Sequence, residues 1–300
     1  MTKEQGKPLL ADATSVTVAD IVHAMDTAYP PALAEKWDQV GLICGDPEAE
    51  VTKVLFALDC TQSVAEEAVN SGAQMLIVHH PLLLRGVHSV AANTPKGKVI
   101  HTLITGGVAL FAAHTNADSA RPGVNDALAQ LVGITPGRPI APKLDTSSEN
   151  ELDTKQLALE TACGLGRVGE LDQPMTLREF TQQVANALPE TAWGVRASGD
   201  PDKMIRTVAV SSGSGDSFLE AAASLGADVF VSSDLRHHPV DEHLRASGMA
   251  VIDTAHWASE FPWCYQARDV VSAAVGVSCE VIEIRTDPWT VSAHPKEHQS

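Results

Sequence analysis

Short apolar runs alternate with helical patterns along most of the chain. Apolar runs typical of buried strands occupy residues 54–58, 75–78 and 108–113, and helical patterns at about 63–71 and 96–105 separate them. Strands that alternate with helices in this way imply right-handed crossovers and a largely parallel sheet. This part of the chain therefore predicts a βαβαβ unit.

The same order recurs in the second half of the chain. Apolar strands are predicted at residues 207–211, 229–232 and 249–254, with helices at about 218–225 and 241–246 between them. Both copies end in a His-x-x-x-acid segment, which indicates an internal duplication. The predicted fold class is α/β, with duplicated βαβαβ units forming two similar, interlinked halves.

A polar connection separates the two predicted halves. Residues 136–155 are rich in Pro, Ser, Asp and Glu, which indicates an exposed segment. We place the first half at residues 1–140 and the second at 141–300. Residues 262–300 are expected to pack back on the first half.

Local signals refine several boundaries. Ser63 and Glu66 have the spacing of a capping box, which predicts that Ser63 opens the first crossover helix. A short helix is predicted at residues 33–37. Gly213-Ser214-Gly215 is predicted to be a turn before the helix at 218–225, and it is also a candidate phosphate cradle.

The composition fits a globular protein with a sizeable core, since 44% of the 300 residues are hydrophobic and 20% are charged. A formal net charge of −17 disfavours nucleic acid as the main ligand, because binding to backbone phosphates relies on a positive surface. Five scattered cysteines indicate neither a disulfide framework nor a thiolate zinc site. Without a signal-peptide pattern or an apolar run of membrane-spanning length, the chain is expected to be cytoplasmic, with no membrane partner.

Polar side chains with metal-binding chemistry follow the predicted strands. His79 and His80 come directly after the strand at 75–78, and Pro81 ends that strand. In parallel sheets, ligands bind beyond the carboxyl ends of the strands. A histidine pair alone is more often part of a surface loop, and a His and a Glu four residues apart are more often a surface ion pair. Their joint placement in both copies favours a metal site.

Five residues form the candidate metal-ligand set: His79, His80, Asp118, His256 and Glu260. Supporting or substrate-contacting candidates are His114, Asp38, Asp234, His238, Arg121 and Asn125. A capping or turn role explains Asp38 somewhat better than a place in the site does, and charge balance explains Arg85 and Arg121 equally well. Imidazole and carboxylate ligands without thiolate suit Zn, Mn, Fe or Co, and more than four such ligands would hold two ions. The sequence singles out no catalytic residue.

The motifs together resemble the NIF3-like family, whose members are also named GTP cyclohydrolase type 2 homologues. The resemblance covers about residues 16–289. Its motifs are Trp37-Asp38-x-Val40-Gly41-Leu42, Val78-His79-His80-Pro81, His114-Thr115-Asn116-x-Asp118, Gly164-x-Gly166-Arg167-Val168-Gly169, Gly213-Ser214-Gly215 and His256-x-x-x-Glu260. The chain departs from the family at Ser233-Asp234, where Gly-Asp is usual, but it keeps the carboxylate.

The resemblance implies a duplicated α/β fold and a toroidal hexamer with two divalent metal ions per subunit inside the ring. The implied ligands are the five residues of the candidate set. Among the first-half residues, Asp118 is expected to bind metal and His114 to support the site, because His79 and His80 already supply imidazoles.

A metal-dependent hydrolase acting on a nucleotide or phosphoester-like substrate is the favoured function, because two ions sharing a hydroxide are typical of such enzymes. The alternative is a non-catalytic, metal-binding hexameric scaffold or regulator. A third interpretation, a nucleotide-binding module that uses the glycine turns, would predict nucleotide affinity that survives chelation.

Overall fold

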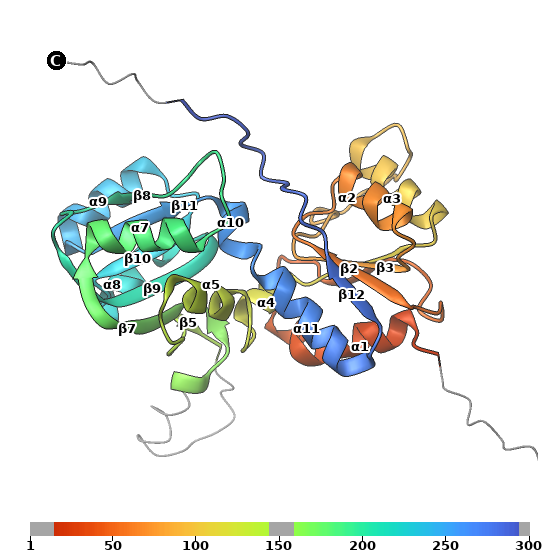
Figure 1. Ribbon diagram of the computed structural model, residues 1–300, viewed down its shortest axis with the longest axis horizontal. Coiled ribbons are helices and arrows are strands. Elements are labelled where there is room, and N and C mark those ends of the chain that lie inside the picture. Colours follow the sequence, from red (N-terminus) through yellow and green to blue (C-terminus); the bar gives the residue numbers. More distant parts are fainter. Residues whose placement is uncertain (1–14, 144–158, 294–300) are drawn as a thin grey trace, which may run out of the picture.

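Two five-stranded sheets with three parallel central strands each form the framework of the protein. The structure, a computed structural model, describes residues 15–143 and 159–293. Figure 1 shows the two sheets side by side, each with its own crossover helices. The predicted α/β class and the duplication are confirmed.

The first sheet has the strand order β1-β4-β3-β2-β12. Its strands are β1 (Gly41–Cys44), β2 (Lys53–Ala57), β3 (Met75–Val78), β4 (Ala109–Ala112) and β12 (Ser278–Val281). The crossover helices α2 (Gln62–Asn70) and α3 (Pro95–Thr105) connect the parallel strands β2, β3 and β4. Every residue of β3 and β4 is buried, as expected for strands covered on both faces.

The second sheet has the order β7-β9-β10-β11-β8. Its strands are β7 (Arg167–Thr176), β8 (Arg196–Ser198), β9 (Met204–Ser214), β10 (Val229–Ser233) and β11 (Ala250–Thr254). The helices α8 (Leu219–Ser224) and α9 (His237–Ser247) connect the parallel strands. The copies differ at one edge, where β12 runs parallel to β2 but β7 runs antiparallel to β9.

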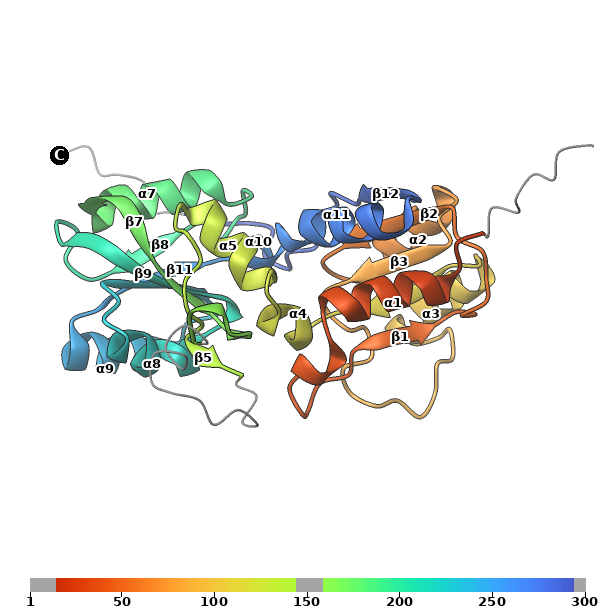
Figure 2. The ribbon, with the colours of Figure 1, turned by 90° about the horizontal axis from the view of Figure 1, so that it is seen from below.

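Helices cover both faces of each sheet and fill the junction between the sheets. Figure 2 shows α4 (Thr115–Ser119) and α10 (His256–Glu260) between the sheets. The remaining larger helices are α1 (Val18–Ala28), α5 (Val124–Val132), α7 (Leu177–Ala187) and α11 (Trp263–Val275). One buried apolar cluster contains Phe56 of the first sheet, Val208 of the second and Trp263 of α11, so both sheets pack on a common core. The short strands β5 (Ala141–Pro142) and β6 (Gly164–Leu165) pair separately.

Four boundary predictions were wrong. The helix predicted at 33–37 is instead a short 3₁₀ helix, η1 (Pro31–Leu33), where Pro31 presets the backbone for a tight turn. The cap of α2 is Thr61, whose hydroxyl accepts the Val64 N–H, and not Ser63. β9 continues through the predicted glycine turn to Ser214. α9 begins four residues earlier than predicted, because Pro239 is tolerated in a first turn.

The predicted polar connection lies mostly outside the described residues, as do the polar segments 1–14 and 294–300. The boundary between the halves stays a prediction. No helix within the described ranges is long and apolar enough to cross a membrane.

Candidate metal centre

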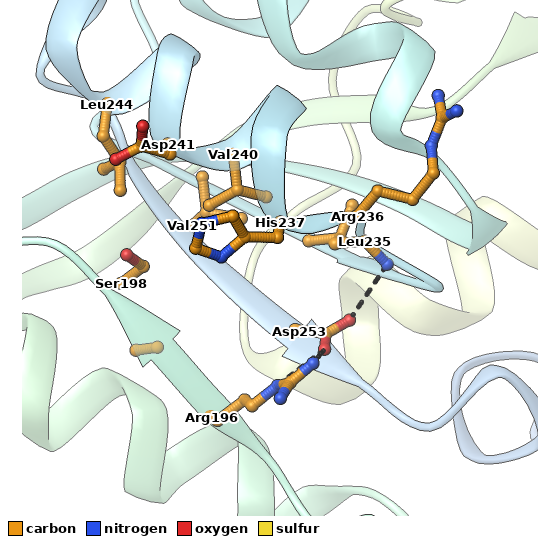
Figure 3. A pocket seen from close by; sticks show the side chains of 11 residues that line it. Arg196, Ser198, Leu235, Arg236, His237, Val240, Asp241, Leu244, Val251 and Asp253 are labelled. Atoms are coloured by element: carbon orange, nitrogen blue, oxygen red, sulfur yellow. Dashed lines mark hydrogen bonds and ion pairs between the residues drawn. The ribbon is translucent and has the colours of Figure 1, made fainter.

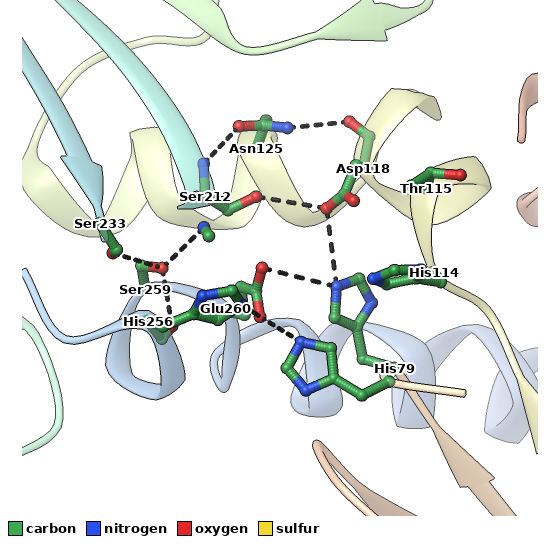
Figure 4. A network of polar contacts seen from close by, with 12 residues as sticks. His79, His114, Thr115, Asp118, Asn125, Ser212, Ser233, His256, Ser259 and Glu260 are labelled. Atoms are coloured by element: carbon green, nitrogen blue, oxygen red, sulfur yellow. Dashed lines mark hydrogen bonds and ion pairs between the residues drawn. The ribbon is translucent and has the colours of Figure 1, made fainter. Parts of the chain in front are cut away.

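Four histidine rings meet at the junction of the two sheets. His79 and His80 follow β3, His114 follows β4, and His256 opens α10 directly after β11. The ring centroid of His80 lies 5.0 Å from that of His79, 5.7 Å from that of His114 and 5.2 Å from that of His256. The carboxyl ends of parallel strands from both copies therefore supply one shared cluster (Figure 4).

Two carboxylates complete the cluster. The Nε2 atom of His79 lies 3.7 Å from Oδ1 of Asp118 and 3.7 Å from Oε1 of Glu260. The other oxygen of Glu260, Oε2, lies 2.8 Å from Nε2 of His80 and 3.1 Å from Nε2 of His256. Helix α10 places His256 and Glu260 on one face, as their four-residue spacing requires. Glu260 consequently faces different histidines with its two oxygens.

Each histidine is held from behind through its second ring nitrogen. The Nδ1 contacts are His79 to the carbonyl of Ala113 (2.8 Å), His80 to Asp59 (2.7 Å), His114 to Asp38 (3.0 Å) and His256 to Asp234 (2.7 Å). Partners of this kind fix the orientation of an imidazole and leave its Nε2 atom for a ligand, an arrangement typical of metal-binding histidines.

The supporting carboxylates follow strands or precede them closely. Asp59 escaped the sequence reasoning, although its place just after β2 is the same signal that singled out His79. Asp38 also accepts hydrogen bonds from the backbone N–H and the hydroxyl of Thr115. Asp234 has a φ of 54°, a left-handed conformation that is uncommon for a residue other than glycine. Asp38, Asp59 and Asp234 orient the imidazole rings, and none of them belongs to the groups of residues whose ligand atoms could hold a metal ion.

The remaining candidates lie in different places. Asn125 donates to the carbonyl of Asp118 and accepts the N–H of Ser212, both at 2.9 Å, and so links α5 to β9 beside the cluster. Arg121 donates instead to the carbonyls of Gly137 and Pro136. His238 is exposed on α9 and contacts the ring of His237. The structure brings neither Arg121 nor His238 into the cluster.

The donor atoms fit a divalent cation. Ligand atoms lie within 4.8 Å of one another in three overlapping groups: His79, His80 and His114; His80, His256 and Glu260; His79, Asp118 and Glu260. Nε2 of His79 is buried without a hydrogen-bond partner, and Oε2 of Glu260 has only the Nε2 atoms of His80 and His256 beside it. Buried polar atoms are almost always satisfied, and a cation bound by nitrogen and oxygen ligands would satisfy both of these atoms.

The electrostatics of the metal-free site favour protons on two of the histidines. Burial lowers the pKa of His80, but the carboxylates of Glu260 and Asp59 outweigh it and raise that pKa to about 10. Glu260 raises the pKa of His256 to about 11 against the effect of burial. Burial raises the pKa of Asp118, whereas for Glu260 the histidines overcome burial and hold the pKa well below its usual value. A bound cation would therefore replace protons in this site.

Gly213 leaves space for the carboxylate of Glu260. A Cβ atom on Gly213 would lie 2.3 Å from Oε1 of Glu260, and its φ of +59° is also unfavourable for other residues. The N–H of Gly213 donates to the hydroxyl of Ser259 at 3.0 Å. That amide is thus engaged within the protein and not free to bind a phosphate.

The fold and the cluster define a class: a duplicated α/β protein with histidines and carboxylates gathered between its two sheets. The chain belongs to the Duf34/NIF3 (NGG1p interacting factor 3) family, whose model matches residues 16–288. This confirms the family expected from the motifs.

The similarity to known proteins covers nearly all of this chain. A Streptomyces coelicolor protein named GTP cyclohydrolase 1 type 2 homolog is 46% identical over 91% of this chain and 93% of its own. A Mycobacterium leprae protein of the same name is 38% identical over 93% of this chain and 96% of its own. Among solved structures, a hypothetical protein of Staphylococcus aureus matches with a TM-score of 0.80 at 33% identity, covering 92% of this chain and 99% of that one. A Bacillus cereus protein related to NIF3 has a TM-score of 0.83 at 24% identity, covering 93% and 100%, which shows the shared fold.

Proposed function

We propose that this protein is a hydrolase that depends on two divalent metal ions. The observation that carries the proposal is that imidazole nitrogens and carboxylate oxygens converge at one place. Each imidazole ring is also oriented by a hydrogen bond at its Nδ1 atom. The ligands are His79, His80, Asp118, His256 and Glu260. When bound, such ions polarise a substrate and lower the pKa of water, which supplies a nucleophile near neutral pH.

The number of donors supports two ions. A structural zinc site is complete with four ligands, whereas the three groups here include six residues. Glu260 belongs to two of the groups and directs Oε1 toward His79 and Oε2 toward His80 and His256. It is therefore suited to bridge two ions. The metal is Zn, Mn, Fe or Co.

His114 has two competing roles. Its supporting role stays a prediction, motivated by the imidazoles that His79 and His80 already supply. One of its ring nitrogens nevertheless groups with those of His79 and His80, and its Nδ1 atom is held by Asp38 as in the other three rings. This geometry favours direct ligation as the alternative for His114.

The substrate class, the assembly and the location in the cell are proposed with the support of the family. The name of the bacterial relatives supports a nucleotide substrate, and a two-metal site supports a nucleotide or another phosphoester-like small molecule. A toroidal hexamer in the cytoplasm is the assembly we propose. Neither membrane nor nucleic acid is expected as a partner.

Elemental analysis combined with a hydrolysis panel tests the proposal. The protein is purified without oxygen, and metal per chain is compared with turnover of nucleotides, nucleosides and phosphoesters. We expect two ions per chain and turnover in proportion to metal. His80→Ala should lose both, whereas His101→Ala, an exposed histidine on α3, should lose neither.

Metal-replete protein without turnover on any panel member would contradict the hydrolase and leave the hexameric scaffold or regulator. Nucleotide binding that persists in a chelator, again without turnover, would instead favour the nucleotide-binding module.

A further inference from the structure

A cavity of about 420 Å³ opens beside the cluster of histidines and carboxylates. Its lining includes His80 and His256, two of the proposed ligands, and also Trp193 and Trp289. The volume lies within the range of about 300–1,000 Å³ that is typical of small-molecule sites. A molecule in this cavity would therefore lie within reach of both these histidines and the two indole rings.

The two tryptophans come from distant segments and meet at this cavity. Trp193 precedes β8 and Trp289 follows β12, and their ring centroids lie 5.8 Å apart at an interplanar angle of 44°. Trp193 is 37% exposed and Trp289 is 59% exposed. Large aromatic rings that stay open to solvent next to a cavity are typical of ligand recognition.

Trp193 packs against a paired arginine. The guanidinium carbon of Arg196 lies 4.6 Å from the centroid of the Trp193 ring, and Arg196 is paired with the buried carboxylate of Asp253 at 2.7 Å. Figure 3 shows Asp253 between Arg196 and the backbone N–H of Leu235, beside a separate cavity of about 320 Å³. A ring held in this way loses little freedom when a second ring stacks on it.

Among the described residues, the cavity offers a phosphate group no lysine or arginine. Asp59, Asp234 and Asp287 line it, and no lysine or arginine is among its lining residues in the part of the chain that the structure describes. Asp287 is only 6% exposed, and its Oδ2 atom is buried without a hydrogen-bond partner. His80 pairs with Asp59 and His256 with Asp234, which leaves Asp287 as the lining carboxylate without a histidine beside it. An anionic group in the cavity would meet this charge, whereas a ligand N–H could use it as an acceptor.

From these contacts we infer that the cavity binds a flat, neutral or cationic heteroaromatic ring of the nucleobase or nucleoside kind. The ring stacks on Trp193 and Trp289 and donates a hydrogen bond to Asp287, and forms that carry a triphosphate are rejected. This inference rests on the proposed function, because it places the ring beside His80 and His256. It narrows the substrate from a nucleotide or phosphoester to the ring itself.

Binding titrations that do not depend on turnover test the inference. Guanosine, adenosine, cytidine and uridine are each compared with their own 5′-triphosphate by calorimetry and tryptophan fluorescence, in a chelator and again with zinc. In the chelator, at least one nucleoside should bind about 10-fold more tightly than its own triphosphate, or tighter still. Trp289→Ala should weaken the binding of that nucleoside about 10-fold, since stacking on an aromatic ring contributes most of such affinity. Trp289→Phe should retain most of the binding.

Trp37→Ala, measured in the chelator, is the matched control, because Trp37 is also 59% exposed and contacts His114 but does not line the cavity. It should bind the nucleoside as the unchanged protein does. Asp287→Asn should narrow the difference in affinity between nucleoside and triphosphate, since it removes the charge of the lining carboxylate that no histidine pairs with.

The inference is overturned if no nucleoside binds below millimolar concentration, if the triphosphates bind as tightly as the nucleosides in the chelator, or if Trp289→Ala changes nothing. Tryptophan-dependent binding without any turnover would contradict the hydrolase alone. Turnover that is insensitive to Trp289→Ala would contradict only the ring site.

Discussion

Arg167 and Asp126 form a buried, bidentate ion pair. Nε of Arg167 lies 2.9 Å from Oδ1 of Asp126, and Nη2 lies 2.7 Å from Oδ2. The Arg167 side chain has no solvent exposure and also donates to the carbonyls of Gly164, Gly166 and Ala120. It therefore joins β7, at the edge of the second sheet, to α5 and to the residue directly after α4. Helix α4 carries Asp118.

Arg167→Met should strongly destabilise the protein. It leaves the carboxylate of Asp126 buried without its partner, and breaking a buried pair on one side costs about 3–5 kcal/mol. Urea unfolding measures the change in the free energy of unfolding. Arg206→Met is the control, because the Arg206 pair with Glu170 is exposed and such pairs are worth at most about 1 kcal/mol. Equal losses in the two variants would refute a special role for the buried pair.

Asp118→Ala and Glu260→Ala should each lose metal severely, because both carboxylates face Nε2 of His79 in the cluster. His114→Ala should weaken metal binding about 10- to 100-fold, the range for a residue that supports a ligand. Metal per chain and metal affinity are measured at equal folding. Complete loss in His114→Ala with retention in Asp118→Ala would reverse these roles.

Gly213→Ala should lower metal affinity, since the added Cβ would lie 2.3 Å from Oε1 of Glu260. Gly226→Ala separates this contact from backbone strain, because Gly226 also has a positive φ but a Cβ atom added to it would meet nothing within 4 Å. Both variants should lose about 1–2 kcal/mol of stability. Only Gly213→Ala should lose metal affinity, and equal affinities in the two variants would contradict the role of Gly213.

The metal-free protein should lose stability in alkali. The folded-state pKa values of His80 and His256 are about 10 and about 11, above the unfolded value of about 6.5. Their contribution is therefore full below pH 6.5 and is lost as the pH rises through 10 and 11. The urea midpoint in a chelator should fall from pH 7 to pH 10, and it should fall less in a His80→Asn, His256→Asn double variant. A drop of the same size in that variant would assign the effect to other groups.

The chain is expected to form a ring-shaped hexamer with the metal sites facing its interior. This expectation comes from the family resemblance. Light scattering at micromolar concentration measures the mass of the assembly, and a monomer or a dimer would contradict it.

The central strands, and the histidines that follow them in both halves, could be predicted from the sequence for a physical reason. A strand buried on both faces must be a continuous apolar run, as in β3, so its end is visible where His79 begins. The parallel arrangement then brings such ends to one edge of each sheet. Both signals are local in the sequence, and they needed no knowledge of packing.

Other features depend on partners that are distant in the sequence. The role of Asp59 is set by His80, 21 residues away, and the Asp126 pair with Arg167 spans 41 residues. No periodic pattern marks either contact. At the start of α2, Thr61 and Ser63 both have a hydroxyl of the kind that caps helices, and the sequence alone could not decide which of them does so. The Trp193 and Trp289 contact is equally invisible until the chain folds.

The first sheet receives its last strand from the far end of the described chain. β12 pairs in parallel with β2, from Ser278 beside Lys53 to Val281 beside Phe56. A ribosome adds about 5–20 residues per second, so the apolar strand β2 waits roughly 10 s or more after its own synthesis before β12 emerges. Unpaired strand edges attract other chains during such an interval. A polypeptide released before residue 278 would keep this edge open permanently, which makes late truncation a source of aggregation and not merely of a shortened tail.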